Sequence, residues 1–112
     1  MKVAVIGSRG IYKVPLTEYL PDETTELVSG GAVGVDRCAK TFADISGLPI
    51  KEFLPDYKKY GRGAPLRRNI EIIDYSDLVL AFWDGHSRGT RFVIENCKKK
   101  KIPIRVFLKR TS

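Results

Sequence analysis

The stretch 26–43 constrains this chain most, because a short apolar run passes through a glycine-rich turn into a helical pattern. The apolar run ends at Val28, which predicts the end of a buried strand. From Val35 the apolar residues recur on one face of a helix. The turn between the two elements contains Gly30, Gly31 and Gly34.

A turn of this composition has a physical use. Glycine adopts backbone conformations that are closed to other residues and lets a ligand approach the chain closely. The helix that follows presents unpaired N–H groups and a partial positive charge, which favour an anion such as phosphate. The spacing matches neither the Rossmann fingerprint nor the P-loop. A turn with a purely structural role is the alternative interpretation.

The rest of the chain alternates between short apolar runs and helical patterns, which predicts one α/β domain over residues 1–112. Such a chain forms a parallel sheet of about five strands with right-handed crossovers. A mobile loop near the site is expected over Asp56–Ala64, and Leu66, Ile70 and Ile73 are expected to face the core. The predicted strands are Lys2–Ile6, a strand that ends with Leu27 and Val28, Pro49–Leu54, Asp77–Phe82 and Ile104–Leu108; the predicted helices are Tyr12–Leu20, Val35–Ser46, Pro65–Tyr75 and Gly89–Lys101.

Three glycine-containing turns follow predicted strands. They are Gly7–Gly10, Ser29–Gly34 and Asp84–Gly89. The carboxyl ends of parallel strands meet at one edge of the sheet, and ligands bind there in open α/β folds. The meeting of the three glycine-containing turns at this edge therefore predicts a site for a small ligand there.

The net charge of +7 comes from the end of the chain. The last 15 residues carry seven basic residues and no acid, whereas residues 1–97 carry 13 of each sign. Lys98–Lys101 close the last predicted helix, where cations favour the helix dipole, so a solvated helix end is one interpretation and a polyanion-binding patch is the other. The topology predicts that these lysines lie at the far end of the sheet from the glycine turns.

Composition excludes several other classes. No apolar run approaches the length of a membrane span, and the apolar stretch at the start is too short for a signal peptide. Cys38 and Cys97 fall on apolar helix faces and are expected to be reduced core residues of a cytoplasmic protein. With His86 as the one histidine, no metal cluster is expected.

Four motifs cover nearly the whole chain. They are Gly7-Ser8-Arg9, the S-G-G-A-x-G-x-D match Ser29–Asp36, the P-x-x-R-N match Pro65–Asn69, and the second ligand loop Gly85–Thr90. Together they resemble the SLOG superfamily, named after the DNA-processing proteins Smf/DprA and the cytokinin-activating LOG enzymes. The most similar branch is that of the small stand-alone SLOG proteins related to YspA, which are predicted to bind nucleotide-derived ligands.

The resemblance implies a Rossmann-like three-layer sandwich with helices on both faces, which binds a nucleotide or phosphosugar and forms a homo-oligomer such as a dimer. It implies no certain cofactor beyond that ligand. Asp36 would shape its turn or bind a ribose hydroxyl. The other implied ligand-binding residues are Gly7, Ser8 and Arg9 at the border, Ser29, Gly30, Gly31, Ala32 and Gly34 in the phosphate turn, Gly89 and Thr90 at the opposing helix start, and Arg68 and Asn69 from the third helix.

The chain departs from the catalytic pattern of the LOG branch, P-G-G-x-G-T-x-x-E. Val93 stands three residues after Thr90, where those enzymes have a glutamate, and Glu95 is five residues away. The resemblance therefore does not carry phosphoribohydrolase activity to this chain. Asp36, Arg68 and Glu95 are weak catalytic candidates, with Asp84 as a further acid.

Three hypotheses follow. The first is a binding module or sensor for a nucleotide or its derivative. The second is a hydrolase that cleaves an N-glycosidic or phosphate bond in the same crevice. The third is a single-stranded DNA-binding protein like the DNA-processing branch, motivated by Arg9, Arg67, Arg68 and Arg88 and by Tyr57 and Tyr60, which could stack on bases.

Overall fold

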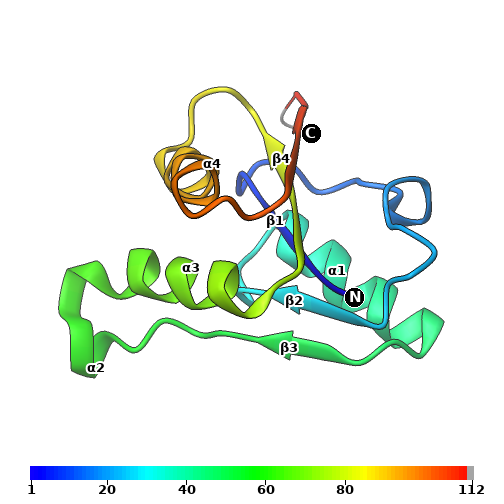
Figure 1. Ribbon diagram of the computed structural model, residues 1–112, viewed down its shortest axis with the longest axis horizontal. Coiled ribbons are helices and arrows are strands. Elements are labelled where there is room, and N and C mark those ends of the chain that lie inside the picture. Colours follow the sequence, from blue (N-terminus) through cyan, green and yellow to red (C-terminus); the bar gives the residue numbers. More distant parts are fainter. Residues whose placement is uncertain (111–112) are drawn as a thin grey trace.

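A five-stranded, all-parallel sheet forms the centre of the computed structural model, which describes residues 1–110 (Figure 1). The strand order is β3-β2-β1-β4-β5. This sheet confirms the predicted α/β class. The strands are β1 (Lys2–Gly7), β2 (Glu26–Ser29), β3 (Ile50–Glu52), β4 (Leu78–Trp83) and β5 (Ile104–Leu108).

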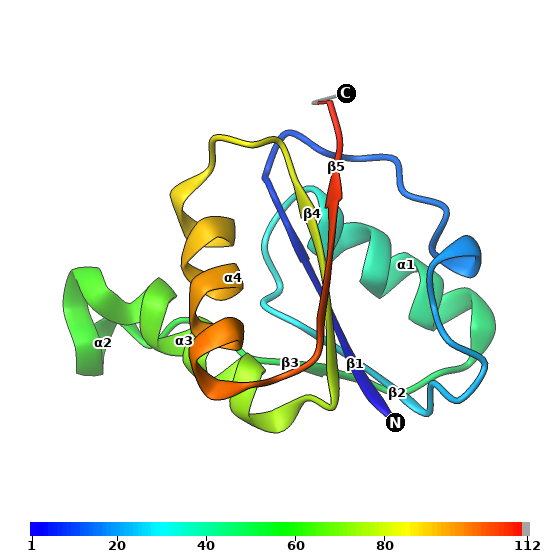
Figure 2. The same ribbon diagram turned by 45° about the horizontal axis from the view of Figure 1, so that its top comes forward.

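Helices cover both faces of the sheet and complete a Rossmann-like three-layer arrangement. Figure 2 shows α1 on one face and α3 with α4 on the other. Along β1, Val3 and Val5 pack on the α1 side, and Ala4 and Ile6 pack on the opposite side. A strand covered on both faces is apolar throughout. The helices are α1 (Val35–Ser46), α2 (Tyr57–Tyr60), α3 (Ala64–Tyr75) and α4 (Arg88–Lys100).

The order in which the strands are added to the sheet reverses at β1. In the hydrogen-bonded register, Val3 lies opposite Leu27 of β2 and opposite Leu78 of β4. The chain first builds outward to β3 and then returns to place β4 and β5 on the other side. This point of reversal leaves a crevice beyond the carboxyl ends of β1 and β4, where ligands bind in such folds.

The predicted helix over Tyr12–Leu20 is wrong, because the structure has only a single 3₁₀ turn there, Leu16–Glu18. Proline disfavours helical geometry at the preceding residue, and Pro15 therefore keeps Val14 out of a helix. Tertiary contacts fix the segment instead. Ile11 and Leu16 are buried in the core, and the carbonyl of Tyr12 accepts a hydrogen bond from Cys38 Sγ at 2.8 Å.

The segment Asp56–Ala64, predicted as a loop, is helical instead. It contains α2, a 3₁₀ turn over Gly61–Gly63 and the first residue of α3. Asp56 caps α2, because its Oδ1 accepts a hydrogen bond from Lys59 N at 3.1 Å. An aspartate before a helix is a recognised start signal, so this turn was open to prediction.

The core-facing side of α3 also differs from the prediction. Ala64, Ile72 and Ile73 are buried, Ile70 is half-buried, and Leu66 is 43% exposed. The first turn of α3 extends beyond the sheet edge and has no core beneath it. The apolar spacing of the sequence therefore continues into a part of the helix that is not packed.

Candidate ligand-binding site

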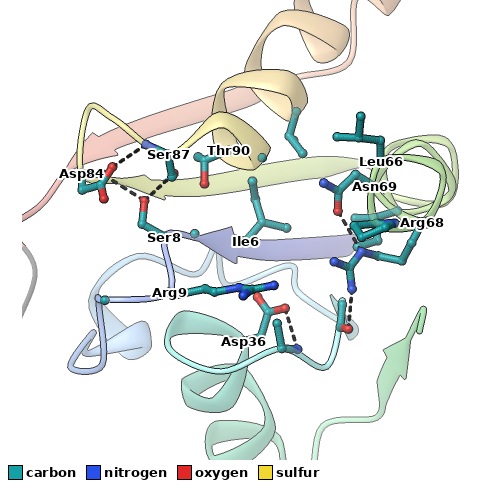
Figure 3. Close-up of a pocket in the computed structure, with 18 residues that line it drawn as sticks. Ile6, Ser8, Arg9, Asp36, Leu66, Arg68, Asn69, Asp84, Ser87 and Thr90 are labelled. Atoms are coloured by element: carbon teal, nitrogen blue, oxygen red, sulfur yellow. Dashed lines mark hydrogen bonds between the residues drawn. The ribbon is translucent and has the colours of Figure 1, made fainter. Parts of the chain in front are cut away.

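A cavity of about 420 Å³ opens beyond the carboxyl ends of β1 and β4 (Figure 3). This volume lies in the range of small-molecule sites. All three predicted glycine turns contribute to its wall. The lining residues are Ile6, Gly7, Ser8, Arg9, Gly10, Gly30, Ala32, Asp36, Pro65, Leu66, Arg68, Asn69, Ile72, Asp84, Ser87, Gly89, Thr90 and Val93.

Most of the predicted ligand-binding residues are brought together here, but Ser29, Gly31 and Gly34 do not line the cavity. Ser29 is fully buried, and its Oγ accepts a hydrogen bond from Gly31 N at 3.1 Å. Gly34 lies against the carbonyl of Arg9. These three residues therefore shape the turn from behind the cavity wall.

The carboxylate of Asp36 lies at the N-terminal end of α1, where a bound anion would otherwise lie. Its side chain is 7% exposed, and Oδ2 accepts a hydrogen bond from Ala32 N at 3.1 Å. Burial raises the pKa of Asp36, while that hydrogen bond and the charge of Arg68 act against the rise. The N–H groups of Gly31 and Ala32 are thus already hydrogen-bonded within the protein, and a negative charge lies where the turn was expected to cradle phosphate.

Arg68 ties α3 to this turn. Its Nη1 donates to the carbonyl oxygen of Gly30 at 2.6 Å, and its Nε donates to Asn69 Oδ1 at 2.9 Å. Burial lowers the pKa of Arg68, and the carboxylate of Asp36 opposes that change. The bond to Arg68 takes up the amide oxygen of Asn69, so the amide nitrogen is the group that Asn69 has left to offer a ligand.

The start of α4 is open, in contrast to that of α1. Its N-cap residue, Ser87, makes no side-chain capping bond, because its Oγ is paired with Ser8 Oγ at 2.8 Å. The first turn of α4 contains no acidic residue. Thr90 is 5% exposed, and in the described part of the chain its hydroxyl has no hydrogen-bond partner. Figure 3 shows this hydroxyl directed into the cavity.

Asp84 organises the loop that leads to α4. Its Oδ1 accepts hydrogen bonds from the N–H groups of His86 and Ser87, both at 2.8 Å. These bonds hold the pKa of Asp84 below its ordinary value. Trp83 supports the same loop, since its Nε1 donates to the carbonyl of Ser87 at 3.1 Å. Asp84 therefore stabilises the loop before α4 at the rim of the cavity.

Sequence reasoning missed the apolar part of the wall. Ile6, Leu66, Ile72 and Val93 line the cavity, and their apolar spacing in the sequence is indistinguishable from that of core residues. The two aromatic candidates for stacking, Tyr57 and Tyr60, lie outside the lining. The catalytic candidate Glu95 is exposed on α4 and is also outside it.

The described residues contain no helix that is both long and apolar enough to cross a membrane. Comparison with known proteins finds no matching family model and no matching solved structure. The Gene 61 protein of Mycobacterium phage D29 is 32% identical over 117 aligned positions, which cover 92% of this chain and 93% of the phage protein. At this identity and coverage, the chain belongs to the same family as the phage Gene 61 protein.

Proposed function

We propose that this protein binds a nucleotide, or a nucleotide-derived or phosphosugar ligand, in the cavity at the carboxyl ends of the strands, as a sensor or binding module. The observation that carries the proposal is the pairing of an uncapped helix start with the hydroxyl of Thr90, which has no partner among the described residues and is accessible from the cavity. A hydroxyl that opens into a cavity without a partner in the protein can exchange its water for a hydrogen bond to a ligand oxygen. The resemblance to the SLOG superfamily supports the same ligand class.

The phosphate group belongs at the start of α4 rather than at the turn before α1. The N–H groups of Gly89 and Thr90 lie in a helical first turn without a capping side chain or an acid, and the helix dipole favours an anion there. The corresponding position at α1 holds the carboxylate of Asp36, which repels a phosphate. Arg9, exposed at the cavity rim, adds a positive charge within the lining.

The remaining wall suits the rest of a nucleotide. Ile6, Leu66 and Val93 offer apolar surface to a flat ring. The amide nitrogen of Asn69 is a donor, and the carboxylate of Asp36 is an acceptor for sugar hydroxyls. The cavity thus combines an anion end, an acceptor and an apolar wall, which favours a phosphorylated ligand with a sugar and a ring.

Calorimetric titration with AMP, ribose 5-phosphate, inorganic phosphate and adenosine tests the proposal. We expect the three phosphorylated ligands to bind and AMP to bind best, because it fills the apolar wall as well. Thr90→Val preserves the side-chain shape without the hydroxyl and should weaken AMP binding by about tenfold, on the order of one hydrogen bond to a charged group. Thr90→Ser retains the hydroxyl and is the matched control. Absence of binding across the panel would refute the proposal.

A second pair of variants tests whether a negative charge at the start of α4 competes with the ligand phosphate. An added Cβ at Gly89 meets no atom within 4 Å, so the fold leaves room for a side chain to start there. Gly89→Asp places a carboxylate in the first turn of α4 and should abolish binding of phosphorylated ligands. Gly89→Asn has the same shape without the charge and should retain most of it. Equal loss in both variants would indicate steric blockage instead.

Hydrolysis in this cavity is the second candidate function, and Asp36 is the observation that favours it. A carboxyl that lines a cavity, and whose pKa is raised by burial, is a candidate for proton transfer to or from a ligand. Incubation with AMP, ADP-ribose and NAD, followed by chromatography, tests this candidate. Turnover that Asp36→Asn removes, with AMP binding retained, would support it; intact substrates would leave the binding module as the function.

A further inference from the structure

The outer edge of β5 is an open strand edge in the described part of the chain. β5 is the last strand in the order of the sheet and pairs only with β4. The carbonyl of Pro103 accepts from Val79 N at 3.0 Å, and Lys109 N donates to the carbonyl of Trp83 at 2.8 Å. Backbone groups alternate in direction along a strand, so those of residues 104, 106 and 108 point away from β4.

Apolar side chains accompany these outward backbone groups. Val106 is 40% exposed and Leu108 is 71% exposed. In the β4–β5 register Leu108 lies opposite Trp83, which is half-buried. The edge therefore offers both unpaired hydrogen-bonding groups and an apolar strip formed by Trp83, Val106 and Leu108.

The whole excess of positive charge surrounds this edge. Lys98–Lys101 precede β5, Arg105 lies within it, and Lys109 and Arg110 follow it, with no acid in the last 15 residues. Lys100 is paired with Asp74, and Lys109 donates to Tyr19 Oη, but Arg105 and Arg110 are exposed and have no partner among the described residues. The proposed ligand site leaves these charges unexplained.

We propose that the outer edge of β5 receives an extended, acidic segment of another protein as a sixth strand of the sheet. Strand addition of this kind takes its affinity from backbone hydrogen bonds and its specificity from alternate side chains. Apolar residues on one face of the segment would contact Val106 and Leu108, and acidic residues on the other would face Arg105. The segment would therefore alternate between apolar and acidic residues.

The same charges argue against a second copy of this chain at the edge. Antiparallel pairing of two β5 strands would place Arg105 and Lys109 of one copy beside those of the other, and like charges across strands are destabilising. Charged residues commonly protect sheet edges from self-association. Arg105 and Lys109 repel an identical strand and attract an acidic one. The repulsion and the attraction both contribute to specificity. The opposite edge, β3, has only three residues and carries Lys51 beside Glu52.

The probe is a synthetic peptide of about six residues, the usual length of a strand, with alternating glutamate and valine. Trp83 is the one tryptophan of the chain and lies at the apolar strip, so its fluorescence reports binding. We expect saturable binding that weakens with salt, and no binding of a peptide with proline at its centre. Equal binding of both peptides would overturn strand addition.

Val106→Pro is the decisive variant, because it removes an outward N–H without breaking a bond to β4. It should reduce peptide affinity by at least about tenfold, the value of roughly one hydrogen bond, while Val106→Ala retains most of it. Arg105→Glu should weaken the glutamate peptide and favour a lysine–valine peptide. This charge exchange tests the proposal even if Val106→Pro does not fold.

Two other occupants of the edge would appear as distinct results. A single-stranded oligonucleotide that competes with the peptide and binds Val106→Pro as well as the wild type would indicate a polyanion surface and overturn the proposal. Native mass spectrometry that shows a dimer of the wild type and a monomer of Val106→Pro would assign the edge to a second copy and overturn it as well.

Discussion

Arg68 donates a hydrogen bond from Nη1 to the carbonyl oxygen of Gly30 at 2.6 Å and so joins α3 to the turn before α1. Its guanidinium lies so close to Gly30 that an added Cβ would stand 2.5 Å from Nη1 and 2.8 Å from Cζ. Two sides of the candidate site, far apart in the sequence, are therefore fixed to each other by one charged side chain.

Gly30→Ala should displace Arg68 and cost about 1–3 kcal/mol of unfolding free energy, the usual range for a lost buried hydrogen bond. Because the guanidinium is the mobile end of a long side chain, we expect displacement and not unfolding. Denaturant unfolding in a double-mutant cycle with Arg68→Ala measures the coupling. If Gly30→Ala costs the same with and without Arg68, the two residues are not coupled.

Gly34→Ala should be clearly more destabilising than Gly47→Ala. Both glycines have φ of 79°, but ψ is 7° at Gly47, in the left-handed helical region, and −128° at Gly34, in the mirror-β region that glycine alone enters readily. Gly47→Ala therefore carries the left-handed strain of about 1–2 kcal/mol, and the backbone strain of Gly34→Ala is larger. A Cβ at Gly47 meets nothing within 4 Å, whereas a Cβ at Gly34 lies 2.7 Å from the carbonyl oxygen of Arg9, a backbone atom that cannot swing away. Thermal unfolding of the two variants gives the comparison directly, and equal losses would contradict the packing at Gly34.

The contributions of Asp36 and Asp84 to the free energy of unfolding should change in opposite directions as pH rises. The pKa of Asp36 is raised above its ordinary 3.8, so the folded state holds the proton more tightly and stability falls as pH rises through the raised pKa. The pKa of Asp84 is lowered, so its contribution is complete above 3.8 and is lost as pH falls through the folded value. Carboxyl-carbon NMR titration should place the two midpoints on opposite sides of 3.8.

Cys97 should resist alkylation that modifies Cys38. Cys97 is fully buried, and burial raises its pKa to about 11, so roughly one thiol in a thousand is ionised at pH 8. Cys38 is half-buried at the surface of α1. Mass spectrometry after iodoacetamide treatment should find one modified cysteine in the folded protein and two after denaturation. Rapid double modification of the folded protein would contradict the packing of α4.

The local signals of the sequence determined some elements well. The predicted bounds of α1 and β5 agree with the structure, because Gly47 ends α1 in a left-handed conformation and proline precedes β5. The predicted helix over Tyr12–Leu20 failed because tertiary contacts, including the bond from Cys38 to the carbonyl of Tyr12, hold that segment. No local pattern encodes such a contact.

The position of the candidate site could be predicted, but its polarity could not. The topology places the three glycine turns at one edge, and ten of the predicted residues line the cavity there. The glycines of the turn before α1 predict a phosphate cradle only if the N–H groups of the turn are free. Whether an N–H is free depends on the rotamers of Ser29 and Asp36, which follow from packing around the turn.

The placement of β1 between β2 and β4 also constrains how the protein is made. β1 leaves the ribosome first, yet one of its two neighbours is β4, which is translated after α3. Until β4 emerges, β1 can pair along only one of its two edges, the edge that faces β2. Long-range parallel pairing is slow to form. While the residues between β2 and β4 are synthesised, β1 therefore exposes one unpaired edge, at which a wrong strand can pair.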